Sequence, residues 1–439
     1  MAKQPSVLFL NRAYPPVRGA TGRMLRDLAR AFVRDGWAVT VVTTGTTDRD
    51  EKDGPIRIVR AAANLKSKSV FGYAGVWFKL LRGGMKQPAH DLVITMTDPP
   101  MLVSAGQLIA KAKKSRHMHW CQDLYPDLLP TLGFNLPDPL LNLLRKKSRQ
   151  DMAACDKVVT IGRCMARTLS HSGIDAKRIS VIPNWPDFEL IPGRSPRFSM
   201  KNRFRRANGV AANAKEAAAS VVARPHEELF RDGDTPKFRV LYSGTLGRAH
   251  PIGTILDAAE ILSREAKDVE LVFVGDGAGQ DRLMAERARR RLENIRFLPW
   301  QPASRLRELM ESGDVHLVSM THDAAGMLVP SKLYSALAVA RPCILIGPPH
   351  SEAARVINDF MAGREVSQGD AEGLAYTIMD FRNNGDMWMA AHKGAATAGQ
   401  IFVPDESINA WLKRARDVVG LPSRPETGTA SGKREEKAA

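Results

Sequence analysis

The chain has 439 residues, which is too long for one core of usual size and suits two domains of about 200 residues with a tail. A hydrophobic fraction of 44% and a charged fraction of 25% are ordinary for a globular protein. The net charge of +17 favours anionic partners, which leaves nucleic acid, an anionic bilayer or phosphorylated small molecules open.

The cysteines argue against a structural zinc site. Cys121, Cys155, Cys164 and Cys343 have neither CxxC nor Cys/His ligand spacing, which predicts reduced, packed thiols and a cytosolic protein. The first apolar run is too short for a signal peptide, and no uncharged apolar stretch approaches 18 residues. We therefore expect no segment that spans a membrane.

The first hundred or so residues read as alternating strands and helices. The apolar run SVLFLN is followed by the loop RAYPPVRGATG, a helical pattern over residues 23–34 and the strand AVTVVTTG, which together predict a βαβ unit. Gly19, Ala20, Thr21 and Gly22 lie where the loop opens the helix, so their backbone N–H groups could face an anion. On spacing alone, small residues also serve any tight turn between strand and helix.

Residues 70–86 predict a helix with a broad apolar face, including Trp77, edged by Lys79, Arg82 and Lys86. Such a helix suits the surface of an anionic bilayer. A helix packed on the sheet with a basic edge fits the same pattern, and the residues do not decide between the two.

The segment SRHMHWCQDLYPDLL predicts a strand that runs into a loop rich in polar groups. His117 and His119 share one strand face, but spacing places no third metal ligand beside them, so a half-buried strand face explains them better. Asp123 lies just past the carboxyl end of this strand, where open α/β sheets bind ligands.

The second half repeats the strand, glycine loop and helix order after an irregular stretch at 188–236. Its first loop holds Gly244, Thr245, Gly247 and Arg248, and the turn GDGAG follows the next strand. Residues 326–342 then combine a loop, Pro330 and a helix start. Ser331, Lys332 and the first helical turn could meet a phosphate there, although on these residues alone an ordinary turn with a solvated lysine is the better explanation.

With the preceding half-chain, the stretch GMLVPSKLYSALAVARP resembles the retaining glycosyltransferases of family 4 with the GT-B fold. It is most similar to the subgroup that builds bacterial capsule and exopolysaccharide repeat units and has a Pro-Ser-Lys-Leu helix start. The resemblance implies an α/β protein with two Rossmann-like domains facing across a cleft. It also implies a nucleotide-sugar donor, with UDP favoured.

The resemblance implies roles for individual residues. Asp123, Lys332 and Arg248 are expected to be catalytic, and Tyr125, Asp127 and Asn184 to lie on the acceptor side. The expected donor-binding residues come from both halves of the chain and are Gly19, Thr21, Gly244, Thr245, Gly247, Gly275, Gly277, Gln301, Pro330, Ser331, Lys332, Leu333 and Glu352.

The chain departs from the family pattern at two glutamates, whose positions align with Met327 and Ser335. Ribose recognition must then use other groups, such as backbone or Glu352. Thr245 stands where many members have an arginine, so Arg248 and Lys332 are expected to supply the positive charge.

We expect an acceptor-side domain at 1–187, a linker with an insertion at 188–236, and a nucleotide-sugar domain at 237–400. A helix at 401–419 is expected to return to the first domain, before a disordered tail at 420–439. The expected reaction transfers a hexose or N-acetylhexosamine type of sugar, with retention, to a lipid-linked saccharide at the inner face of the cell membrane. Neither a metal nor another cofactor is expected to be obligatory.

Three alternatives remain open. An epimerase of the same fold would bind the same donor, and a catalytically inactive scaffold is compatible with the missing glutamates. A nucleic-acid-binding protein would explain the charge, but the clusters KAKK, RKKSR, FRR and ARRR are dispersed and have no aromatic platform. We therefore expect no nucleic-acid partner.

Overall fold

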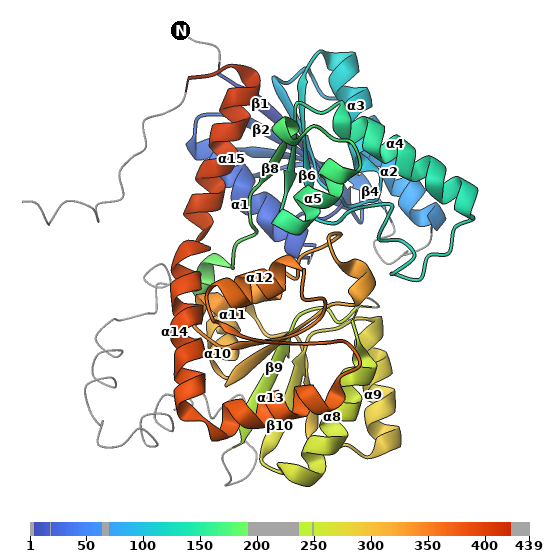
Figure 1. Ribbon diagram of the computed structural model, residues 1–439. Helices are drawn as coiled ribbons and strands as arrows, with labels where there is room; N and C mark the ends of the chain where they lie inside the picture. Colours follow the sequence, from blue (N-terminus) through green and yellow to red (C-terminus); the bar gives the residue numbers. More distant parts are fainter. Residues whose placement is uncertain (1–3, 18, 64–69, 192–236, 248–249, 423–439) are drawn as a thin grey trace, which may run out of the picture.

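The computed structural model describes residues 4–17, 19–63, 70–191, 237–247 and 250–422 (Figure 1). Two α/β domains lie one above the other, and a pair of consecutive helices, drawn in red, runs along one side of both. Most of 188–236, Arg248 and all of 423–439 lie outside the described residues, so the predictions made for them are not addressed by the structure.

The first domain is built on an eight-stranded sheet among the described residues, in the order β3-β4-β2-β1-β5-β6-β7-β8. All pairs are parallel except β3 with β4, an antiparallel pair at one edge. The strands are β1 (Ser6–Leu10), β2 (Ala38–Gly45), β3 (Arg49–Asp53), β4 (Ile56–Ala62), β5 (Leu92–Thr95), β6 (Arg116–Cys121), β7 (Lys157–Thr160) and β8 (Ile179–Val181).

The second domain has a six-stranded sheet among the described residues, in the order β11-β10-β9-β12-β13-β14, and every pair is parallel. The strands are β9 (Phe238–Ser243), β10 (Val269–Val274), β11 (Ile295–Leu298), β12 (Val315–Ser319), β13 (Cys343–Ile346) and β14 (Gly363–Val366). Both domains therefore have the Rossmann-like arrangement expected from the sequence.

Helices cover both faces of each sheet, because the buried strands are apolar on both sides. In the first domain, α1 (Ala20–Arg34) and α5 (Arg163–His171) pack on one face and α2 (Val70–Met85) and α3 (Leu102–Lys113) on the other, with α4 (Asp138–Ala153) beside α3. The second domain carries α8 (Ile252–Glu265), α9 (Ala278–Arg290), α10 (Leu306–Glu311), α11 (Lys332–Ala338), α12 (Glu352–Asp359) and α13 (Ala371–Asn383).

The last helices join the two domains. α14 (Gly385–Ile401) packs on the second domain, and α15 (Pro404–Val419) crosses to the first (Figure 1). There Trp411 is fully buried, its ring centroid 4.9 Å from that of Trp120, and Arg416 binds Asp35 at 2.7 Å between Nη2 and Oδ2. The last helix of the described residues thus completes the core of the first domain.

Two parts of the fold are absent from the sequence analysis. β3 is a charged edge strand, RDEKD, without apolar alternation, and its charges suit an edge that must not pair with another chain. α14 contains Gly394 and Gly399, which lower helix propensity. A Cβ at Gly399 would lie 2.4 Å from the Leu337 carbonyl oxygen, so close packing against α11 explains this glycine.

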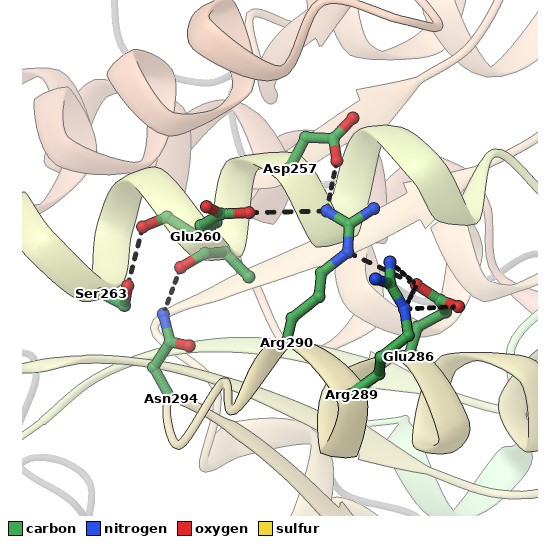
Figure 2. Close-up of polar contacts among 8 residues, drawn as sticks. Asp257, Glu260, Ser263, Glu286, Arg289, Arg290 and Asn294 are labelled. Carbon is green, nitrogen blue, oxygen red and sulfur yellow. Dashed lines mark hydrogen bonds and ion pairs between the residues drawn. The ribbon is translucent and has the colours of Figure 1, made fainter.

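An ion network fixes α9 against α8 in the second domain (Figure 2). Nη1 of Arg290 lies 2.5 Å from Oδ1 of Asp257 and 3.6 Å from Oε2 of Glu260, both on α8. On its own helix, Arg290 also contacts Glu286, which in turn binds Arg289 at 2.8 Å. The network therefore holds the C-terminal end of α9 against α8.

No helix in the described part of the chain is long and apolar enough to cross a membrane.

We predict that Trp411→Ala lowers the free energy of unfolding by about 3–5 kcal/mol, the usual cost of truncating a buried tryptophan. Urea unfolding followed by circular dichroism measures the loss. Lys413→Ala, on an exposed position of the same helix, should leave the midpoint nearly unchanged. Equal midpoints for Trp411→Ala and Lys413→Ala would show that α15 contributes little to the first core.

Candidate active site between the two sheets

Most of the predicted donor-side residues lie at one edge of the second sheet. Residues 244–247 follow β9, Gly275 and Gly277 follow β10, Gln301 follows β11, and residues 330–333 follow β12. Because these strands are parallel, the loops at their carboxyl ends meet at the same edge, where α/β sheets bind ligands. The structure thus brings these residues together from four separate loops.

Gly275 and Gly277, in the loop after β10, are required by contact with the backbone of the loop after β9. A Cβ at Gly275 would lie 2.3 Å from the Gly244 carbonyl oxygen, and one at Gly277 would lie 2.5 Å from that of Leu246. Backbone hydrogen bonds of 2.8 Å continue the pairing, from Gly244 N to Val274 O and from Leu246 N to Asp276 O. The two loops therefore form one stacked platform, and the glycines are explained without any ligand.

Lys332 extends over this platform. Its Nζ donates to the Thr245 carbonyl oxygen at 3.2 Å and lies 4.9 Å from the centre of the Tyr242 ring. A Cβ at Gly244 would come within 2.7 Å of the lysine Cε, so this glycine also makes room for the lysine. Burial lowers the pKa of Lys332 to about 8, because removal from water disfavours the ammonium form.

His250 lies beside the two stacked loops, in contact with Tyr242 and Ser319. Its Nδ1 lies 2.9 Å from Oγ of Ser319 and its Nε2 lies 3.4 Å from the hydroxyl of Tyr242. Burial, with a smaller contribution from Lys332, lowers the pKa of His250 to about 3. The imidazole is therefore neutral at physiological pH and adds no second positive charge beside the lysine.

The helix start at Ser331 is formed much as the sequence predicts. Leu333 N donates to Pro330 O at 3.2 Å, and α11 begins at Lys332 with Ser331 as its N-cap. The Ser331 side chain makes no capping hydrogen bond, and Leu333 is fully buried. The lysine and the serine hydroxyl therefore lie at the loop edge, while Leu333 belongs to the core.

The facing edge of the first sheet carries a charged cluster around Asp123. Arg12, after β1, forms an ion pair of 2.7 Å between its Nε and Oδ1 of Asp98, after β5. Burial, and then the negative charge of Asp98, raise the pKa of Asp123 to about 7. Arg12 and Asp98 are not among the site residues expected from the sequence, although their position directly after parallel strands is a signal for such residues.

Two of the three predicted acceptor-side residues have structural partners in the first domain. The Asp127 carboxylate binds Arg149 at 2.9 Å and Arg145 at 3.5 Å, both on α4. Asn184 is buried and donates through Nδ2 to Oε1 of Gln122 at 2.8 Å.

Tyr125, the third acceptor-side residue, lies on the same loop as Asp123, and burial raises the pKa of its hydroxyl well above the ordinary value. Gly19 is the N-cap of α1, with φ 153°, and Thr21 lies half-buried in its first turn. Their donor contacts stay predictions.

The two edges contact each other directly. Leu124 N donates to Met327 O at 2.7 Å, and Asp123 forms an isolated antiparallel bridge with Leu328. Leu328 lies only four residues before Lys332 in the sequence. The loop after β6 and the loop after β12 therefore place Asp123 and Lys332 on two segments that touch across the domain interface.

Glu352 lies at the same interface but has a defined partner. Its buried carboxylate accepts hydrogen bonds from the Arg163 backbone N at 2.7 Å and from Arg163 Nε at 3.0 Å, at the start of α5. Arg163 also contacts Asp359 at 3.1 Å. In this arrangement Glu352 holds the two domains together, and contact with a ribose would require this ion pair to open.

The positions of the missing glutamates are occupied by groups with other roles. Met327 contributes its backbone to the interface, and Ser335 lies half-buried on α11. Gln301 donates to the Pro299 carbonyl oxygen at 2.9 Å beside Trp300, which is 40% exposed. Neither Met327 nor Ser335 offers a carboxylate for a ribose.

His117 and His119 point to the same side of β6, as their spacing predicts, and both contact Oγ1 of Thr95, at 2.9 and 3.0 Å. No group of three or more His, Cys, Asp or Glu within the described ranges is arranged to hold a metal ion.

Residues 21–190 match the family model described as Glycosyltransferase Family 4, and residues 237–384 match the model described as Glycosyl transferases group 1. The chain carries a family 4 glycosyltransferase domain followed by a group 1 glycosyltransferase domain. WcaI of Escherichia coli (strain K12), named as a colanic acid biosynthesis glycosyl transferase, is 27% identical over 313 residues, which span 70% of this chain and 69% of that protein.

Solved structures share the fold of this glycosyltransferase. Sucrose-phosphate synthase from Thermosynechococcus elongatus superposes with a TM-score of 0.70 at 14% identity, covering 95% of this chain and 99% of that one. Anabaena HepE in complex with UDP-glucose superposes with a TM-score of 0.64 at 15% identity, covering 94% and 99%. The fold is therefore GT-B, as expected from the sequence.

We predict that Gly275→Ala lowers the free energy of unfolding of this glycosyltransferase by several kcal/mol. The new Cβ would collide with the Gly244 carbonyl, and φ of 144° is unfavourable for alanine. Gly253→Ala is the matched control, since nothing lies within 4 Å of its Cβ position on α8. That control should be neutral or stabilising by up to about 1 kcal/mol in urea unfolding. Equal stability of the two variants would contradict the stacked platform.

Proposed function

We propose that this protein transfers a sugar from a nucleotide-diphosphate donor, with UDP favoured, to a hydroxyl of a lipid-linked saccharide in bacterial surface polysaccharide synthesis. The observation that carries the proposal is the Lys332 ammonium held over the stacked glycine loops at the carboxyl edge of the second sheet. The group 1 glycosyltransferase domain and the similarity to WcaI support it.

The proposed donor site neutralises the negative charge that develops on the leaving diphosphate. Lys332 offers a charge beside backbone N–H groups of the glycine loops, and the Ser331 hydroxyl lies next to it. Arg248, in the same loop but outside the described residues, is part of this proposal. Since the platform is fixed before any ligand arrives, little reorganisation is required during the reaction.

The proposed stereochemical course is retention. The leaving phosphate would take the proton of the incoming hydroxyl on the same face of the sugar, and Asp123 would contact a sugar from the first domain. The direct contact between the segments of Asp123 and Leu328 supports a reaction centre enclosed by both domains. The alternatives are an epimerase, which forms no glycoside, and an inactive scaffold, which would bind a partner without turnover.

We predict that Lys332→Met weakens binding of the preferred nucleoside diphosphate by about 10- to 100-fold, because a charge-assisted contact contributes about 1.5–3 kcal/mol. Turnover should fall further while the fold is retained. In the wild type, affinity should decline as pH rises through about 8, where Lys332 loses its proton, and this decline should vanish in the variant. Calorimetry with UDP and GDP, with and without EDTA, measures both effects.

Lys393→Met is the control for this experiment, because Lys393 is exposed on α14. It should keep the wild-type affinity and pH dependence. Unchanged binding in Lys332→Met would remove the lysine from the donor site. Absence of binding of either nucleotide to the wild type would favour the scaffold alternative.

The acceptor side of the proposal places the first domain on the inner face of the cell membrane. Helices α2, α3 and α4 are neighbours, and they expose large apolar side chains beside many lysines and arginines. Phe78 is 64% exposed on α2, Leu108 51% on α3 and Leu143 62% on α4. Exposed apolar side chains on three basic helices suit an anionic bilayer. Val76 and Leu80 of α2 are buried against the sheet, so a membrane contact of residues 70–86 would use the opposite face of this helix, where Phe78 is exposed.

We predict that the wild type sediments with vesicles containing phosphatidylglycerol at low salt and is released at high salt. The double variant Phe78→Ser/Leu143→Ser should lose most of this binding, because the inserted apolar area is removed. Tyr376→Ser is the matched control, since Tyr376 is 63% exposed but lies on α13 of the second domain. If the double variant sediments as well as the control, the first-domain face is not the membrane contact.

A further inference from the structure

A small cavity lies directly beneath Asp123 inside the first domain. It is bordered by the ends of β5 and β6 and by helices α3 and α4, and it has room for about one water molecule. Its polar lining consists of Thr97, His119, Asp123, Tyr125 and Ser148, and the remaining lining side chains are mostly apolar. A single water placed there would have the polar partners that a buried water requires.

Thr97 gives independent evidence that a molecule occupies this cavity. Its side chain is 4% exposed, and its Oγ1 has no hydrogen-bond partner among the described residues. A buried hydroxyl without a partner costs about 1–3 kcal/mol, so native proteins usually satisfy such a group with an internal water. Because Thr97 lines the cavity, this water would lie beside Asp123.

After Thr97 and Asp123, His119 offers a third hydrogen-bonding group for this water. Its Nδ1 is used by Thr95 Oγ1 at 3.0 Å, which leaves Nε2 as the ring nitrogen for the cavity. Thr95 also contacts Nε2 of His117 at 2.9 Å, and Nδ1 of His117 lies 3.5 Å from Sγ of Cys155. Burial lowers the pKa of both histidines to about 3, so this network is neutral and fixes the ring orientation of His119.

We propose that Thr97 and His119 bind an internal water that hydrogen-bonds the Asp123 carboxyl group, solvates its charged form and positions it at the domain interface. The two side chains are positioning residues, and their part in catalysis rests on the proposed function. The water replaces solvation that the carboxyl group loses at the closed interface, where Leu328 pairs with its backbone.

Other groups face Asp123 and must be included in any account of its titration. Asp98 lies after β5 and is paired with Arg12 from the loop after β1. Tyr125 follows on the same loop as Asp123, and Tyr73 of α2 lies on the far side of Arg12. Asp127, further along the loop, is paired with Arg145 and Arg149 of α4, a group with a net positive charge. None of these groups is changed by substitution of Thr97.

The test is a carbon NMR titration of Asp123 in the full-length protein with 13Cγ-labelled aspartate, the Asp123 signal being assigned by its loss in Asp123→Asn. Thr97→Val keeps the size of the side chain but removes the hydroxyl, so the water loses one of its hydrogen-bond partners and is held less firmly beside Asp123. The titration midpoint should then rise by about one pH unit, because the carboxylate loses a hydrogen-bond donor. Thr97→Ser, which keeps the hydroxyl, should titrate as the wild type does.

His119→Phe is the second variant and should raise the midpoint in the same direction, with folding of each variant checked by circular dichroism. A wild-type midpoint in Thr97→Val, or an equal shift in Thr97→Val and Thr97→Ser, would overturn the internal water. The readout does not depend on turnover. A shifted midpoint in a protein that transfers no sugar would keep the water site and reject the proposed function.

Discussion

The backbone contact between Leu124 and Met327 is the constraint on which the candidate site depends. It joins the loop after β6 in the first domain to the loop after β12 in the second, so loops from the carboxyl edges of the two sheets contact each other directly. The Arg163 to Glu352 ion pair reinforces this contact at the next pair of loops. Backbone pairing fixes register more narrowly than side-chain contact, and it therefore determines how Asp123 and Lys332 lie relative to each other.

The second constraint is the contact between the glycine loops after β9 and β10, which determines where the Lys332 side chain lies. Gly275 lets the loop after β10 touch the loop after β9, and Gly244 leaves space for the Lys332 side chain. The ammonium is then held between a carbonyl oxygen and the Tyr242 ring, where water is scarce. A phosphate bound beside Lys332 would stabilise its ammonium form and raise the pKa of the lysine again. The packing that holds the lysine is thus the same geometry on which the proposed diphosphate site depends.

The sequence predicts the two sheets, and it predicts which glycine loops follow their strands, because both depend on local pattern. Buried parallel strands read as short apolar runs, and loops at their carboxyl ends read as glycines before helices. Elements that depend on tertiary contact were missed: charged β3 pairs only at an edge, and α14 tolerates glycine because Leu337 approaches it. The partner of Glu352 was equally hidden, since Arg163 lies 189 residues away in the chain. No local pattern encodes such a contact.

Burial acts in opposite directions on the two ionisable groups of the candidate site. It raises the pKa of the Asp123 carboxyl to about 7 and lowers that of the Lys332 amine to about 8, so each lies near neutrality. The negative charge of the neighbouring Asp98 also raises the pKa of Asp123. Near neutral pH, a small change in solvation therefore changes the protonated fraction of Asp123. A diphosphate entering between the domains would favour the proton on both groups, because its negative charge opposes carboxylate and stabilises ammonium. In the proposed reaction, donor binding would therefore be coupled through electrostatics to the protonation state of Asp123.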